Sequence, residues 1–402
     1  MQRLYAITLP ASPCPDTHDL SFRLFRAGWI LALGALVLNL GQVAMLGNIN
    51  AIEKALFLLA GILYLAGKPI RRGPLAAAIV VLLTIVLGAI FTRFFAFSWT
   101  RAAAATAGLF ALLVFLLARP TARERSLVLE SIALVPVVLV LYGLLLSMTT
   151  GTSMFFRDHT GALRLAGALH PAFLAAASYA GALSNAFLYE QHKRLRPLAL
   201  CVASLVICVL TGTRMPSVCA AASCALVIVG ATRGGASRIG IVALGVIVAA
   251  AFLFTFGDQI LVRFLSGSSS GREDLWRVLE EWIVRHPLAG VGLGHHGLLI
   301  PESITRFTRT AAAHNEYLRV LVELGYPGAL LFIGGLFSLF VLASADRAPE
   351  IRVRSLLLVG FLFVYAWTDN VFYLTYCLLI AVVIAWAPGA AKTSRLPAGD
   401  AA

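Results

Sequence analysis

Apolar runs as long as a membrane span follow one another along almost the whole chain, and this feature constrains the fold more than any other. Charged residues, glycine and proline separate these runs, which lie at residues 27–46, 52–67, 74–92, 101–118, 127–147, 163–189, 196–211, 215–232, 237–256, 321–343, 353–368 and 370–387. Of the 402 residues, 60% are hydrophobic and only 13% are charged, so the chain needs lipid as its solvent. We therefore predict an all-α integral membrane protein with about twelve transmembrane helices.

Basic residues gather in every second connection between the apolar runs, and this asymmetry predicts the orientation of the chain. The basic connections lie at residues 3–26, 68–72, 119–125, 193–196, 233–238, 347–354 and 392–395. Because Lys and Arg are retained on the cytoplasmic side during insertion, we expect both termini in the cytoplasm. The net charge of +13 then reflects topology, and we expect no nucleic-acid partner.

One connection, from Gly257 to about Ala313, is much longer than the others. It falls between the ninth and tenth apolar runs, and the orientation rule places it outside the cytoplasm. We divide the chain into nine spans over 1–256, a helical extracytoplasmic loop domain over 257–313, three spans over 314–390 and a cytoplasmic tail over 391–402.

Arg272 lies at the predicted start of a helix in this loop. The stretch from Ser270 to Glu273 has the pattern of a capping box, and an apolar stripe with helical spacing follows over 275–283. The first turn of a helix attracts anions through its unpaired N–H groups and its dipole. We interpret Arg272 as a phosphate-binding residue. An arginine that reaches to lipid headgroups is an equal alternative.

Arg214 has a similar setting at the outer end of a predicted span. The turn 211–214 connects two apolar runs, and Pro216 suits the first position of the helix that follows. A positive charge in an outer connection opposes the orientation rule, which indicates a role beyond membrane insertion. A plain accident of topology is an equal alternative.

His314 supports a functional role for both arginines because it maps to the same membrane boundary as Arg214 and Arg272. Its helical register predicts that it shares a face with Leu318 and Leu321, while Glu316 and Glu323 lie on the opposite face. A lone histidine on an apolar face is ordinarily a structural residue. Convergence of the two arginines and the histidine at one boundary favours a shared site.

Several further residues allow two interpretations each. Asp369, in the outer turn before the last span, could orient an arginine or a histidine, although capping that span is the simpler interpretation. His170 is predicted to mark a kink inside the sixth span. The glycines of 290–294 are predicted to form turns, since no strand precedes them. His295 and His296 are adjacent without a carboxylate cluster, so we expect no metal.

Three stretches of the second half resemble the bacterial superfamily of O-antigen ligases and polymerases, which are envelope glycosyltransferases. They lie at residues 211–214, 271–294 and 314–328. In length, in number of spans and in its one large periplasmic loop the chain is most similar to the ligases. The resemblance implies a GT-C-like glycosyltransferase of the inner membrane with its active site on the periplasmic side. It also implies transfer of polysaccharide from undecaprenyl diphosphate to a sugar of lipid A-core, without metal or cofactor.

The residue chemistry fits such a reaction. Arg214 and Arg272 would hold the diphosphate, whose charge develops as it leaves, and Asp369 is a possible supporting residue. A sugar hydroxyl has a very high pKa, so a base near neutrality must remove its proton, and His314 is the candidate. The sequence shows no obvious pair of carboxylates for a covalent route, which favours inversion at the anomeric carbon.

Three alternatives stay open. An O-antigen polymerase would use the same donor, although polymerases usually present two substantial periplasmic loops and the connection at about 148–162 is short. A protein O-oligosaccharyltransferase resembles longer chains. A twelve-span transporter or flippase belongs to another class and predicts two related halves with ionisable groups near the middle of the membrane.

Overall fold

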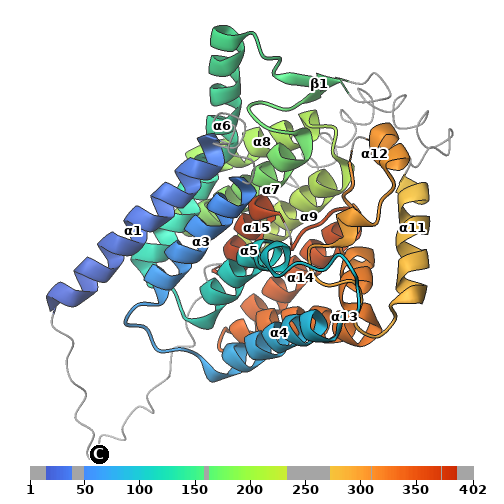
Figure 1. Cartoon of the computed structure of the whole chain (residues 1–402). Coiled ribbons are helices and arrows are strands. Elements are labelled where there is room, and N and C mark those ends of the chain that lie inside the picture. The colour runs from blue at the N-terminus through green and yellow to red at the C-terminus, as the bar shows by residue number, and fades with distance from the viewer. Residues whose placement is uncertain are drawn as a thin grey trace, which may run out of the picture.

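The computed structural model describes residues 15–38, 49–157, 163–232, 272–308, 310–372 and 374–386, and these residues form a bundle of α-helices with one small hairpin (Figure 1). The helices are α1 (Pro15–Leu38), α3 (Ile49–Leu65), α4 (Arg72–Phe91), α5 (Trp99–Leu117), α6 (Ala122–Thr150), α7 (Pro171–His192), α8 (Leu195–Leu210), α9 (Arg214–Ala231), α11 (Arg272–Arg285), α12 (Glu302–Thr308), α13 (Glu316–Ala343), α14 (Pro349–Ala366) and α15 (Thr375–Ala385), with a 3-10 turn η1 (His296–Leu298). Strands β1 (Phe155–Arg157) and β2 (Leu163–Leu165) pair antiparallel.

Six of the described helices are long and apolar enough to cross a membrane: α1 from Asp19 onward, α4, α5, α6, α9 and α13. This agrees with the prediction of an all-α integral membrane protein, whereas the number of twelve spans stays a prediction. The predicted ninth span at 237–256 and the capping residue Ser270 lie outside the described residues.

Helix α7 lies in the middle of the bundle, where α6, α8, α9 and α15 pack around it. Its side chains from Leu174 to Leu188 are all buried. Gly181 allows α6 to approach closely, since a Cβ at this position would lie 2.4 Å from Pro136 Cγ. Because the neighbouring helices surround α7, it can carry buried polar groups, and the side-chain amide of Asn185 donates to the Ala133 oxygen at 3.0 Å. Because other helices pack around α7, the positions of the residues at its two ends are fixed.

The basic connections gather at one end of the bundle. Lys68 pairs with Glu124, which joins the α3–α4 connection to the start of α6. Arg71 and Arg119 both pair with Asp346, which joins those connections to the turn after α13. Three of the basic connections read from the sequence, those at 68–72, 119–125 and 347–354, therefore lie at or next to a common end in space. Which side of the membrane this end faces stays a prediction.

The sixth apolar run begins differently from the prediction. Residues 163–165 form strand β2, and α7 starts only at Pro171. Gly167 has a φ of +59°, which a continuous helix cannot contain. His170 is the N-cap of α7 and its Nδ1 accepts the Ala172 N–H at 3.4 Å, so it does not mark a kink inside a span. A proline at the first helical position and a capping side chain before it explain this start.

The second half of the long loop has a small core of its own. Leu275, Leu279 and Ile283 of α11 are buried, as the helical stripe predicts, and pack in a cluster with Phe94 and Ala313. In Figure 1, α11 stands at the edge of the bundle, and it contacts the nearby α13. The loop domain is therefore attached to the bundle through α11 and α13.

Two glycines allow the chain after α11 to lie directly on α13. The glycines at 290, 292 and 294 all have positive φ, which confirms the predicted turns. A Cβ at Gly290 would lie 2.3 Å from the carbonyl carbon of Glu323. Gly325, with a φ of +68°, divides α13 into two helical segments and leaves the Tyr326 N–H to donate to the Pro287 oxygen at 2.8 Å. Gly325 therefore separates the short segment that follows His314 from the long helical segment after it.

Candidate active site at one end of the bundle

His314 and Asp369 form the centre of the candidate site. Nδ1 of His314 lies 3.5 Å from Oδ1 of Asp369, and the imidazole is 22% exposed while the carboxylate is 8% exposed. The carboxylate also receives the Tyr365 hydroxyl at 3.3 Å and the Asn370 N–H at 2.9 Å. Burial alone would raise the pKa of Asp369, but the hydrogen bond and charge of His314, followed by Asn370 and Arg272, lower it below its usual value. The site therefore contains an ionised carboxylate beside an accessible imidazole.

The structure places Asp369 beside His314 and away from the start of the next described helix. Leu374 occupies the N-cap position of the last described helix, α15, so Asp369 is not its cap. The carboxylate instead pairs with a histidine, which is the interpretation that the sequence analysis ranked second.

The backbone at His314 is held in an unusual conformation. Its φ is +48°, a left-handed value that costs a non-glycine residue roughly 1 kcal/mol. The residues on either side are both fixed, since the Ala313 oxygen accepts the Trp276 indole N–H at 2.8 Å and the Asn315 side chain accepts the Leu318 N–H at 3.1 Å. The surrounding structure therefore determines where the imidazole lies.

The predicted helical register of His314 is wrong. Helix α13 begins at Glu316 with Asn315 as its N-cap, so His314 precedes the helix and shares no face with Leu318. Glu316 and Glu323, predicted to face away from the bundle, are 1% and 0% exposed. The physical reason is Arg319, which lies between them along the helix and supplies the positive charge that their burial requires.

Arg272 and Arg214 lie at the starts of α11 and α9, and the charge of Asp369 acts on Arg272. Burial lowers the pKa of Arg272, the charge of Asp369 opposes this, and the charge of Arg214 lowers the pKa further. Arg272 is therefore within electrostatic reach of both Asp369 and Arg214. The four predicted residues, counting His314, are thus linked in successive pairs: His314 with Asp369, Asp369 with Arg272, and Arg272 with Arg214.

Arg164 is a further cation of this region that the sequence analysis did not single out. Its Nε donates to the Thr211 oxygen at 2.8 Å and its Nη2 to Thr213 Oγ1 at 3.2 Å. Gly212, with a φ of +65°, packs against the guanidinium, because a Cβ there would lie 3.3 Å from Arg164 Nε. Arg164 therefore fixes the turn that precedes Arg214. Little in the sequence marks Arg164 as part of a site, because it is one basic residue in an outer connection.

A buried ionic cluster attaches the loop domain to α13 next to the site. Arg319 Nε donates to Glu316 Oε2 at 3.0 Å and another guanidinium nitrogen pairs with Glu323. Oε1 of Glu323 lies 2.6 Å from His296 Nδ1 and also accepts the His296 backbone N–H at 3.2 Å. Neither arrangement was predicted, because the burial of these groups on α13 depends on His296 of η1, which is distant in sequence.

His295 is likewise held by a structural hydrogen-bond pattern. Its Nε2 accepts the Ser98 N–H at 2.9 Å, so Nδ1 carries the proton and lies 3.0 Å from the Leu293 oxygen. The two adjacent histidines thus have separate partners, on α13 and on the connection before α5.

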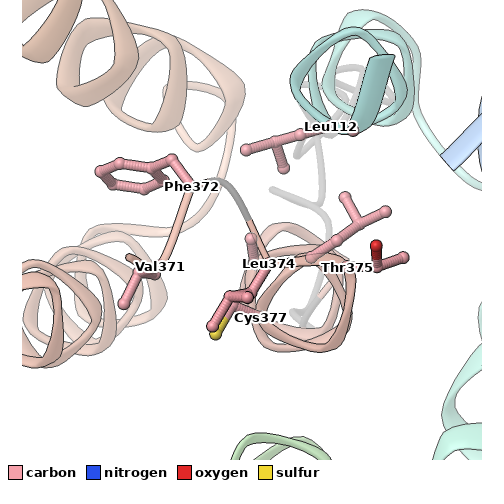
Figure 2. Close-up of a pocket in the computed structure, with 9 residues that line it drawn as sticks. Leu112, Val371, Phe372, Leu374, Thr375 and Cys377 are labelled. Carbon is pink, nitrogen blue, oxygen red and sulfur yellow. The ribbon is translucent and has the colours of Figure 1, made fainter. Parts of the chain in front are cut away.

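An apolar pocket begins two residues after Asp369. Figure 2 shows Leu112 of α5 facing Val371, Phe372 and Leu374 across this pocket, with Thr375 and Cys377 of α15 beside them. The turn that carries the carboxylate therefore borders both the charged site and an apolar space between α5 and α15.

One comparison with known proteins found a family match. Residues 199–333 match the family described as O-Antigen ligase. The matched range contains Arg214, Arg272 and His314, whereas Asp369 lies beyond it. Among curated proteins, no match was found. The family match supports the membership of this chain in the O-antigen ligase superfamily, whose members are glycosyltransferase-like enzymes.

Proposed function

We propose that this chain is an O-antigen ligase, which transfers polysaccharide from undecaprenyl diphosphate to a sugar hydroxyl of lipid A-core. The observation that carries the proposal is the meeting of the His314–Asp369 pair with Arg272 and Arg214, both at helix starts. The site would lie at the periplasmic face of a bacterial inner membrane, with both termini in the cytoplasm. Both substrates are anchored in lipid, so the site would open sideways to the bilayer.

His314 would act as the general base. Asp369 would take the hydrogen bond from Nδ1 of His314, which leaves Nε2 to face the hydroxyl group of the acceptor sugar. The carboxylate would also stabilise the imidazolium that forms. As the acceptor oxygen attacks the anomeric carbon, its proton moves to Nε2. The bond between that carbon and the diphosphate oxygen breaks, and its electron pair leaves with the diphosphate. This direct displacement inverts the anomeric centre.

Arg214 and Arg272 would bind the diphosphate and stabilise the charge that develops on it. Guanidinium groups match phosphate oxygens in two-point contacts, and the helix starts add their N–H groups and dipoles. Arg272 is partly buried and Arg214 is exposed, so the pair spans the entrance and the interior of the site. In this proposal the arginines carry the charge stabilisation, and the chemistry needs no metal ion.

The charged groups within the helices bear on the transporter alternative. Glu53, Lys54 and Arg319 are buried, but they lie within about two turns of the starts of α3 and α13 rather than at mid-helix. A transport pathway would place such groups near the middle of the membrane. Their position favours a site at one face, which agrees with a transferase.

Reconstitution with defined substrates tests the proposal. Purified protein in liposomes, supplied with undecaprenyl diphosphate-linked polysaccharide and lipid A-core, should form the joined product without ATP. Cells that lack the gene should contain free lipid A-core together with full-length polymer on its carrier. If single repeat units accumulate instead, the chain is a polymerase. Transfer to a pilin-like protein but not to lipid A-core would indicate a protein O-oligosaccharyltransferase.

A further inference from the structure

We propose that His170, with Phe156 and Phe173 on either side, forms a subsite that binds the acceptor sugar next to His314. The inference rests on the proposed function and extends it, because it assigns the acceptor a binding residue on the start of α7. The ligand is a pyranose ring with free hydroxyl groups.

Two aromatic rings hold the imidazole of His170 in place. The ring of Phe156 meets it edge to face at 5.2 Å between centroids, and the ring of Phe173 does so at 5.8 Å. Phe173 in turn stacks on Tyr376 of α15 at 5.4 Å with an angle of 12° between the planes. His170 is exposed although its neighbours pack closely. The imidazole is therefore both positioned and accessible, which suits a residue that binds a ligand.

The cap of α7 determines which nitrogen of His170 carries the proton. Nδ1 accepts the Ala172 N–H at 3.4 Å, so the hydrogen of the neutral ring lies on Nε2. Partial burial lowers the pKa of His170, and the charges of Arg164 and His314 act in the same direction while Asp369 opposes them. At neutral pH the ring is thus uncharged and presents one N–H donor.

The hairpin connects His170 to the rest of the site. Phe156 pairs with Arg164 in the strand register, and Arg164 holds the turn before Arg214. The charges of His314 and Asp369 also act on His170. Through Phe156 and the Arg164 strand, the N–H donor therefore lies at the same end of the bundle as the turn that precedes Arg214.

The chemistry of these groups fits a sugar better than a phosphate. A neutral donor gains less from an anion than a guanidinium does, and Arg214 and Arg272 already serve that purpose. A pyranose presents hydroxyl groups, which take a neutral hydrogen bond, and C–H faces, which pack on aromatic rings. Binding the acceptor here would place its hydroxyl beside His314.

Substitutions at His170 separate capping from sugar binding. His170→Asn keeps a capping oxygen but loses the outer N–H, and His170→Gln places an amide N–H near the position of Nε2. Transfer rates would be measured with purified wild-type and variant proteins while lipid A-core and lipid-linked polysaccharide are varied separately. His192→Ala, at the other end of the same helix, is the matched control.

We expect His170→Asn to raise the KM for lipid A-core about tenfold, with the KM for the donor unchanged. His170→Gln should recover part of this loss, and His192→Ala should match the wild type. Equal KM values for lipid A-core in the wild type and His170→Asn would overturn the subsite, as would an equal rise in both KM values. If the wild type binds lipid A-core but transfers nothing, the proposed function fails. Weaker binding of lipid A-core by His170→Asn would then still support the subsite.

Discussion

The indole N–H of Trp276 donates a hydrogen bond of 2.8 Å to the main-chain oxygen of Ala313. Trp276 lies one turn after Arg272 on α11, and Ala313 directly precedes His314. The bond therefore connects the helix that carries a proposed diphosphate ligand to the segment that carries the proposed base. We infer that it sets the position of Arg272 relative to His314.

Trp276→Phe should therefore lower the transfer rate while the protein still folds. Loss of the N–H leaves a buried carbonyl without this donor, and we expect kcat to fall about tenfold. Trp282→Phe is the matched control, because Trp282 lies on the same helix and packs on Phe94 and His286. Steady-state kinetics of the two variants check this. Equal losses of kcat would show that α11 needs a large aromatic residue and that the Trp276–Ala313 bond has no special role.

Asp369→Asn should keep the shape of the site and remove its negative charge. Without the carboxylate, the imidazolium of His314 is less stable, and we expect kcat to fall by about 10²-fold or more. Donor binding, measured separately, should change little if Asp369 acts through His314. A variant with the wild-type kcat would exclude Asp369 from the reaction.

Asp369 should also affect stability at acid pH. Its pKa in the folded protein lies below the usual value, so the unfolded chain binds more protons in the window between the two values. The carboxylate therefore stabilises the fold fully above pH of about 4 to 5, and this contribution is lost as the pH falls through the folded pKa. The melting temperature of Asp369→Asn should depend less on pH between about 5 and 3 than that of the wild type. If the melting temperatures of the two proteins fall equally with pH, this prediction is contradicted.

A substitution in the buried ionic cluster on α13 should lower the stability of the protein far more than a substitution in an exposed ion pair. Arg319→Met leaves two buried carboxylates without their partner, and we expect a loss of about 3 kcal/mol or more. Arg306→Met removes a pair between two exposed residues, Arg306 and Glu302, and should have little effect. Thermal unfolding in detergent compares the two variants. Similar melting temperatures for both would show that the cluster does not stabilise the attachment of the loop.

Two glycines of α13 should respond in opposite ways to alanine. Gly325→Ala places a Cβ 2.5 Å from the Leu288 backbone at a φ of +68°, so both contact and conformation are strained. Gly334 has no neighbouring atom within 4 Å of a Cβ, and Gly334→Ala should be neutral or stabilise by up to about 1 kcal/mol. Melting temperatures decide between the two outcomes. An unchanged value for Gly325→Ala would mean that the turn at Leu288 is free to move.

The sequence predicts the segments of the site better than their local geometry. The capping pattern and apolar stripe place Arg272 at the start of a helix, and the glycines of 290–294 indicate the turns that follow it. Both signals are local. Convergence of Arg214, Arg272 and His314 could be inferred because membrane topology restricts where the ends of the spans can lie.

The parts that could not be predicted depend on contacts between distant segments. Glu316 and Glu323 have the spacing of an exposed face, and only Arg319 and the distant His296 make their burial possible. The hairpin strand at Leu163–Leu165 is too short to show an alternating pattern and continues into an apolar run. Sequence patterns could not reveal either arrangement.

The central claim is that His314 removes the acceptor proton while Arg214 and Arg272 hold the diphosphate. Single-turnover transfer by reconstituted His314→Ala, with donor binding measured in parallel, tests it most directly. We expect the rate to fall by about 10² to 10⁴-fold with the donor Kd unchanged, whereas Arg272→Ala should weaken donor binding as well. A His314→Ala protein that transfers polysaccharide at a rate close to that of the wild type would contradict the account.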